Sequence, residues 1–134
     1  MARLRVGQTE CVAGRTEEFE WSAYEGDGKT PVAFASDDLV RFKLAAKQDG
    51  VPVLDLVSNA ETDNGSRVTI TSLGVAGTSP ATGLVRLARG DTLELSNTMY
   101  FEMNLVDHSD DDRIKQFLRG RLLFMQSQGG EIGT

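Results

Sequence analysis

Apolar and polar residues alternate along most of the chain, with the two-residue period of a strand that is buried on one face. The clearest case is residues 39–47, whose apolar positions are Val40, Phe42, Leu44 and Ala46. The same period, in shorter or less regular form, predicts strands at residues 3–6, 18–24, 51–57, 67–73, 84–88, 98–107 and 114–127. Connections rich in Gly, Pro, Asn, Asp and Ser separate these segments, as turns do.

Eight or nine short strands at close spacing predict an all-β fold. No segment has the longer period of an amphipathic helix, so we expect a β-sandwich, with a small closed barrel as the alternative. The 134 residues are the length of one domain. We therefore expect residues 1–127 to form a single sandwich domain that stands alone, followed by a flexible tail at 128–134.

Residues 89–97 break the alternation and predict one helical turn between two strands. Asp91 or Thr92 is a plausible N-cap of that turn, and Asn97 a plausible exit. In immunoglobulin-type sandwiches, a tyrosine near the start of the following strand donates its hydroxyl back to the corner. We therefore predict a structural corner made by Asp91, Leu95 and Tyr100, with a ligand-stacking role for Tyr100 as the alternative.

The last predicted strand has apolar residues on both faces. Leu118, Leu122 and Phe124 share one face, while Phe117, Leu123 and Met125 lie on the other. A bulge at Gly120 would turn all of them inward; without it they form an exposed patch typical of a protein interface. The candidate interface residues, with two from the N-terminal strand, are Leu4, Val6, Phe117, Leu123 and Met125.

The formal net charge of −6 argues against a nucleic-acid partner, because such binding depends on a basic surface. Cys11 is the single cysteine, which excludes an intramolecular disulfide and a cysteine-cluster metal site. No apolar run approaches the roughly 20 residues of a membrane helix, and no secretory signal precedes the first strand. We expect no membrane partner and synthesis in the cytoplasm.

Candidate chemistry is sparse. Asp91, Glu94, Glu102 and Asp107 offer carboxylates for acid–base catalysis, but we expect them to be solvated, since burial or a like charge is needed to raise a carboxyl pKa. The acidic segment Asp107, His108, Asp110, Asp111 and Asp112 is a candidate cation site, with a solvated loop as the alternative. Arg89–Asp91 spells an integrin-type tripeptide and Asn64–Ser66 a glycosylation pattern; we interpret them as a corner and a turn. We predict neither an enzyme nor a cofactor.

Several short motifs follow one another in an order that carries a resemblance. The chain reads DDLVRFKL, VLDL, NGSRVTI, LVRLARGDTLEL, MYFEMNLVD and RGRLLFMQ in succession, over roughly residues 38 to 127. This order resembles small immunoglobulin-like β-sandwich proteins of tailed-phage and prophage structural modules. It is similar in particular to the N-terminal domain of phage baseplate upper proteins. The resemblance implies an immunoglobulin-like antiparallel sandwich of about seven to nine strands.

The resemblance also implies a function. We expect a non-enzymatic virion protein, made in the host cytoplasm and located in the tail tip, baseplate or fibre-attachment region. Its expected partners are other virion structural proteins or further copies of itself. A capsid cement or decoration protein is the first alternative. A carbohydrate-binding module is the second, with Tyr24 as its exposed aromatic platform.

Overall fold

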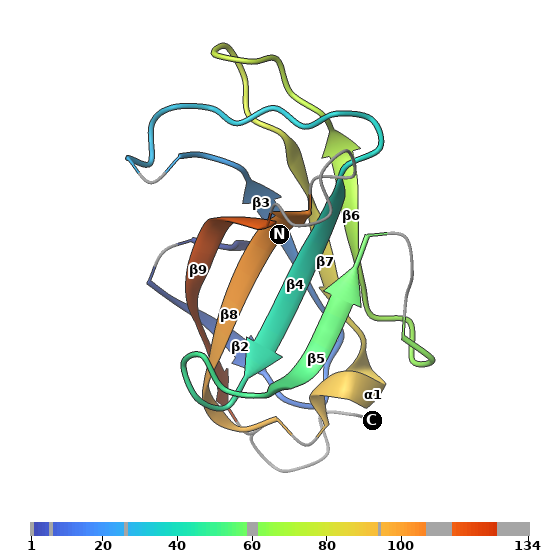
Figure 1. Ribbon diagram of the computed structural model, residues 1–134. Coiled ribbons are helices and arrows are strands. Elements are labelled where there is room, and N and C mark those ends of the chain that lie inside the picture. Colours follow the sequence, from blue (N-terminus) through green and yellow to red (C-terminus); the bar gives the residue numbers. More distant parts are fainter. Residues whose placement is uncertain are drawn as a thin grey trace.

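The computed structural model describes residues 2–5, 7–25, 27–58, 62–93, 95–106 and 114–125. Within them, nine strands form two packed sheets (Figure 1). The four-stranded sheet has the order β1 (Ala2–Arg3), β3 (Glu17–Ser22), β7 (Thr82–Leu87) and β6 (Arg67–Ser72). The five-stranded sheet has the order β2 (Gln8–Val12), β9 (Ile114–Met125), β8 (Asn97–Val106), β4 (Leu39–Ala45) and β5 (Pro52–Val57).

The predicted all-β sandwich is confirmed, and the strands form two separate sheets rather than a closed barrel. From β3 onward the strand order is that of an immunoglobulin domain: β3-β7-β6 in one sheet face β9-β8-β4 in the other, with β5 added beside β4. The two N-terminal strands pair in parallel, β1 with β3 and β2 with β9. The remaining pairs are antiparallel.

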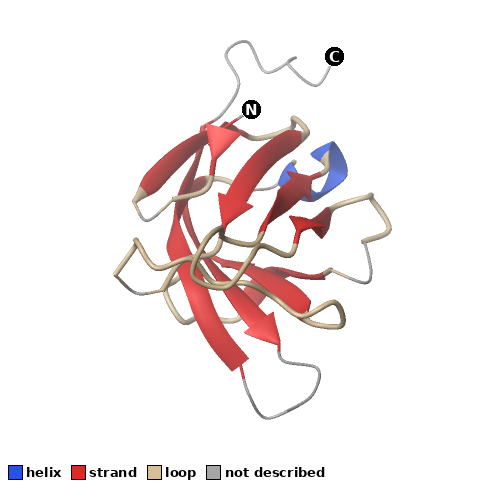
Figure 2. Cartoon of the chain, turned by 90° about the horizontal axis from the view of Figure 1, so that it is seen from above, coloured by secondary structure: helices blue, strands red, loops and turns tan. Residues whose placement is uncertain are grey.

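Figure 2 shows the strands from above, with the four-residue helix α1 (Arg89–Thr92) to one side of them. In Figure 1, α1 lies at one end of the sandwich, and the 24–38 and 73–80 connections lie at the other. Among the described residues, no helix is long and apolar enough to cross a membrane.

The alternation of apolar and polar residues correctly predicted which side chains of most strands point into the core. Val40, Phe42 and Leu44 are fully buried, as predicted for their strand. Ala46 is exposed, because β4 ends at Ala45 and the chain then turns tightly into β5. The sequence did not predict β2, whose inward positions are Thr9 and Cys11 instead of large apolar residues.

A β-bulge on β9 explains why the sequence of this strand has apolar residues at positions of both faces. Met103 pairs with Leu118 and Asn104 with Gln116, so Phe117 is the extra residue of the bulge. The bulge therefore lies three residues before Gly120, the position that the sequence suggested. Phe117 turns inward and packs against Trp21 and Phe34, with ring centroids 5.5 Å from each.

Two of the predicted interface residues pack inside the fold. Leu4 is buried, and Phe117 packs against the core, so neither is free to contact a partner. Leu123 is half-buried and Met125 is exposed on the outer face of β9. Val6 lies outside the described residues.

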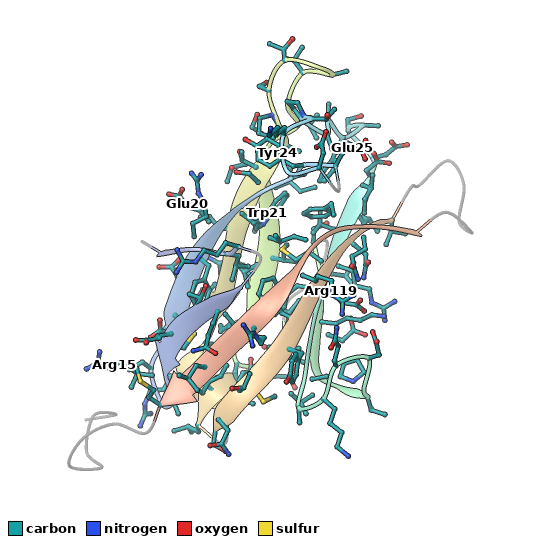
Figure 3. The ribbon with its side chains drawn as sticks, turned by 90° about the vertical axis from the view of Figure 1, so that its left-hand side faces the viewer. Arg15, Glu20, Trp21, Tyr24, Glu25 and Arg119 are labelled. Atoms are coloured by element: carbon teal, nitrogen blue, oxygen red, sulfur yellow. The ribbon has the colours of Figure 1, made fainter. Side chains whose placement is uncertain are left out.

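Trp21 is the largest fully buried side chain and lies between the two sheets (Figure 3). It stands opposite Gly83 on the neighbouring strand β7. A Cβ at Gly83 would overlap both the Trp21 ring and the carbonyl oxygen of Thr69. Glycine is therefore required at this position to let the indole lie flat against β7.

Replacing Gly83 with alanine should destabilise the fold by at least about 3 kcal/mol, because the new methyl group can displace neither the backbone of β6 nor the enclosed indole. Gly77→Ala is the matched control: its Cβ meets open space, and only the positive φ of 72° opposes it, at about 1 kcal/mol. Chemical denaturation measures both. A Gly83→Ala protein as stable as the Gly77→Ala protein would contradict this packing.

Candidate functional site

The corner between β7 and β8 is held by the carboxylate of Asp91, in α1. Asn64 Nδ2 donates to Asp91 Oδ1 at 2.9 Å, and Thr62 Oγ1 donates to Oδ2 at 2.7 Å. The buried hydroxyl of Ser66 also donates to Oδ2 and accepts the Ala88 N–H at 2.8 Å. Asp91 thereby fixes the loop before β6 against the helical turn.

A second set of bonds ties the same corner to the β2–β3 turn. The fully buried Thr92 hydroxyl donates to the carbonyl of Arg15 at 2.8 Å and accepts the N–H of Gly14 at 3.2 Å. Arg89 Nε donates to the Gly14 carbonyl at 3.1 Å, and the Arg89 N–H donates to Thr16 Oγ1 at 3.1 Å. Three segments distant in sequence therefore meet at α1.

The corner residues predicted from the sequence have different surroundings. Asp91 and the buried Leu95 lie in the β7–β8 connection. Tyr100 lies on the outer face of β8, opposite Ala45 and Arg121, and none of the hydrogen bonds that hold α1 to the described segments comes from it. Asp91 itself therefore closes the corner.

The N-cap of α1 differs from the prediction, whereas the exit residue agrees with it. The N-cap is Ala88, with no side-chain cap bond, because Asp91 and Thr92 lie inside the helix and bond to other segments. Asn97 begins β8 with a positive φ of 61°, which asparagine tolerates better than most residues and which suits the predicted exit. The tripeptide Arg89–Asp91 and the turn Asn64–Ser66 are both part of this internal network.

Burial acts to raise the pKa of Asp91, but the hydrogen bonds from Asn64, Ser66 and Thr62 outweigh it and lower the pKa below its ordinary value. A carboxyl whose pKa is lower in the folded state stabilises the fold above its unfolded pKa, and this stabilisation is lost as the pH falls through the folded pKa. Asp91 therefore contributes stability at neutral pH that acid removes.

Asp91→Asn should lower the free energy of unfolding at pH 7 by about 1–3 kcal/mol, the usual loss for hydrogen bonds to a charged group. Below the pKa that aspartate has in the unfolded chain, the free energy of unfolding of the variant should also fall less with decreasing pH than that of the wild type. Asp37→Asn, at an exposed position, is the control and should behave as wild type. Urea denaturation across pH 3–7 tests this, and parallel pH profiles for wild type and Asp91→Asn would contradict it.

The other candidate carboxylates are dispersed. Glu102 lies on the outer face of β8, 3.8 Å from Lys43 Nζ, and accepts a 2.7 Å hydrogen bond from Gln116. Glu94 and the cation candidates Asp107, His108, Asp110, Asp111 and Asp112 lie outside the described residues. Within the described ranges, no group of three or more His, Cys, Asp or Glu residues could hold a metal ion.

Cys11 is buried in the core, on the inner face of β2. Burial, together with the nearby charge of Glu17, raises the pKa of its thiol to about 12. Because the thiolate is the reactive form, Cys11 is unsuited to act as a nucleophile at neutral pH.

The folded protein should therefore react with a thiol reagent such as dithiobis(nitrobenzoate) at least about 100-fold more slowly than the protein in denaturant, at pH 8. The absorbance of the released thiolate measures both rates. Rapid, complete labelling of the native protein would show that Cys11 is accessible and ionised.

The strands at the sheet edges differ in how apolar they are. On β2 the exposed residues are Gln8 and Glu10, and on β6 they are Arg67, Thr71 and Ser72. Along β5 and the residue before it, Val51 and Val53 are 88% and 53% exposed. β5 is therefore the apolar edge of the five-stranded sheet.

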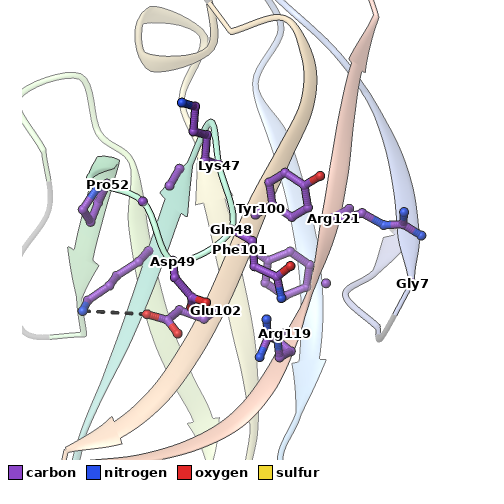
Figure 4. Close-up of a pocket in the computed structure, with 14 residues that line it drawn as sticks. Gly7, Lys47, Gln48, Asp49, Pro52, Tyr100, Phe101, Glu102, Arg119 and Arg121 are labelled. Carbon is purple, nitrogen blue, oxygen red and sulfur yellow. Dashed lines mark ion pairs between the residues drawn. The ribbon is translucent and has the colours of Figure 1, made fainter.

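A groove of about 710 Å³ lies on the outer face of the five-stranded sheet (Figure 4). Its floor is formed by β8 and β9, and the β4–β5 turn and Gly7 border it. Its lining includes Lys43, Lys47, Asp49, Tyr100, Glu102, Arg119 and Arg121. No local sequence pattern predicts this groove, although the alternation of Arg119 and Arg121 with Gly120 and Leu122 places both arginines on one face.

Tyr24, expected to be an exposed aromatic platform, is half-buried and forms a bridge with Pro31. The chain matches no protein-family model, and comparison with the curated proteins and with the solved structures gave no significant match.

Proposed function

We propose that the protein is a non-enzymatic structural component of a phage particle, in the tail tip, baseplate or fibre-attachment region, where it acts by packing against other virion proteins. Two observations support the proposal: the ordered resemblance of residues 38 to 127 to small phage sandwich proteins, and the exposed apolar edge at β5. The β5 edge is the observation on which the proposed mode of action depends.

An edge strand presents backbone groups that a partner strand can bond. Ser58 N–H donates to the Val40 carbonyl, toward β4. By the alternation along a strand, the N–H groups of Val57 and Asp55 point to the open side. Val51 and Val53 add apolar surface beside these groups.

Natural edge strands are commonly protected from pairing by a charged side chain. The one charged residue of β5 is Asp55, and Arg41 on β4 binds it through two hydrogen bonds, from Nε at 2.7 Å and from Nη2 at 2.5 Å. These bonds also lower the pKa of Asp55. The charge is held over β4, which leaves the edge itself open to a partner.

Mass spectrometry of purified particles tests the function. A tail component is expected at a handful to tens of copies, whereas hundreds of copies would favour the alternative of a capsid cement or decoration protein. Intact particles that lack the protein, although the infected cell contains it in abundance, would contradict a virion role.

Val53→Lys should reduce incorporation into particles by about ten-fold or more, because a lysine on an edge strand opposes pairing. Val75→Lys is the matched control: it makes the same change at a residue that is 59% exposed, in a loop away from β5. Both variants should fold as wild type, since neither residue is buried, and thermal unfolding checks this. Normal incorporation of Val53→Lys would exclude β5 as the contact.

A further inference from the structure

The groove on the outer sheet face gathers positive charge in an acidic protein. Four cations line it, Lys43, Lys47, Arg119 and Arg121, against the two carboxylates of Asp49 and Glu102. The whole chain has a net charge of −6, whereas the groove has an excess of positive charge. A groove that concentrates one sign of charge attracts a ligand of the opposite sign.

The two arginines in the groove have no acidic partner within the described part of the chain. Glu102 pairs with Arg119 across β8 and β9 in register, but its carboxylate bonds to Gln116 and lies near Lys43. Arg121 stands opposite Tyr100. Both guanidinium groups are exposed, two residues apart on one strand and on the same face.

The form of the groove favours a small ligand with its own acid group. About 710 Å³ lies within the usual range of small-molecule sites. The backbone of β8 is bonded to β4 and β9 on its two sides, so a peptide strand has no free ladder there to join.

The remaining polar groups suit a hydroxylated ring. Lys47 and Gln48 come from the β4–β5 turn that borders the groove, and Tyr100 presents an aromatic ring with a hydroxyl that can both donate and accept. Arginine forks bind planar carboxylates through two hydrogen bonds. Together these groups match an acid joined to a sugar better than a bare anion.

We propose that this groove binds a short acidic saccharide, with the carboxylate on Arg119 and Arg121 and the sugar ring beside Tyr100. The site lies on the outer face of the sheet, with Pro52 of β5 at its border, and it does not depend on the proposed virion function.

Isothermal titration calorimetry at low ionic strength, with digalacturonate as the probe, tests the proposal. Digalacturonate should bind at least about ten-fold more tightly than its dimethyl ester, which lacks the charge, and than acetate or inorganic phosphate, which lack the sugar. The double variant Arg119→Gln/Arg121→Gln should weaken binding about ten-fold or more, and Tyr100→Ala several-fold.

The matched control is Arg15→Gln/Lys29→Gln, which removes two exposed cations outside the groove and should leave binding unchanged. Figure 3 shows Arg15 well separated from Arg119. Three results would overturn the proposal: no binding of digalacturonate, equal binding of the ester or of phosphate, or full binding by the Arg119→Gln/Arg121→Gln variant when its thermal unfolding matches wild type. Tight binding of a penta-aspartate peptide at the same site would instead favour an acidic protein segment, and would likewise overturn it.

Discussion

Trp21 packs against Gly83 in its own sheet and against Phe117 of the facing sheet, and the arrangement of the sandwich depends on this contact. The indole reaches across the space between the layers because β7 has no side chain beneath it. Phe117 meets the indole because the bulge on β9 turns one additional residue inward. With a single cysteine, the chain joins its sheets without a disulfide, so aromatic packing supplies the connection that a cystine supplies in antibody domains.

The α1 corner performs a different task from the core. Asp91, Thr92 and Arg89 bond to the loops on either side, which closes one end of the sandwich with polar contacts. An acidic residue is well suited here, since three donors converge on one carboxylate and each bond to a charge is stronger than a neutral one. These side chains serve the fold at this end, whereas the β5 edge and the groove are exposed among the described residues.

Much of the fold could be predicted from the sequence because large apolar residues occupy the inward positions of the strands and alternate with polar residues. Val40, Phe42 and Leu44 of β4 are an example. β2 escaped detection because its inward residues are Thr9 and Cys11, which give no hydrophobic period. The position of the bulge was also inaccessible: Gly120 is an obvious breaker, but the extra residue is Phe117, and only pairing with β8 reveals it. The groove depends on residues from β4, β8 and β9, whose adjacency is a property of the sheet order rather than of any local motif.

Asp91 illustrates the same limit at the corner. Its position after β7 indicated a turn, but its partners lie some 25 to 29 residues earlier in the chain, and no local pattern links the two segments. Tyr100 was assigned to that corner by analogy, and the structure instead makes it part of the groove wall. Long-range contacts of this kind decide which polar residues maintain the fold and which remain open to a ligand.

The proposed mode of action is strand pairing between β5 and a partner protein. Hydrogen–deuterium exchange compares the isolated chain with the protein inside purified particles. If β5 pairs with a partner strand, the backbone amides of Asp55 and Val57 should be open in the isolated chain and strongly protected in the particle, while those of the exposed β6 edge should change little. Unchanged exchange at Asp55 and Val57 in the assembled state would contradict it.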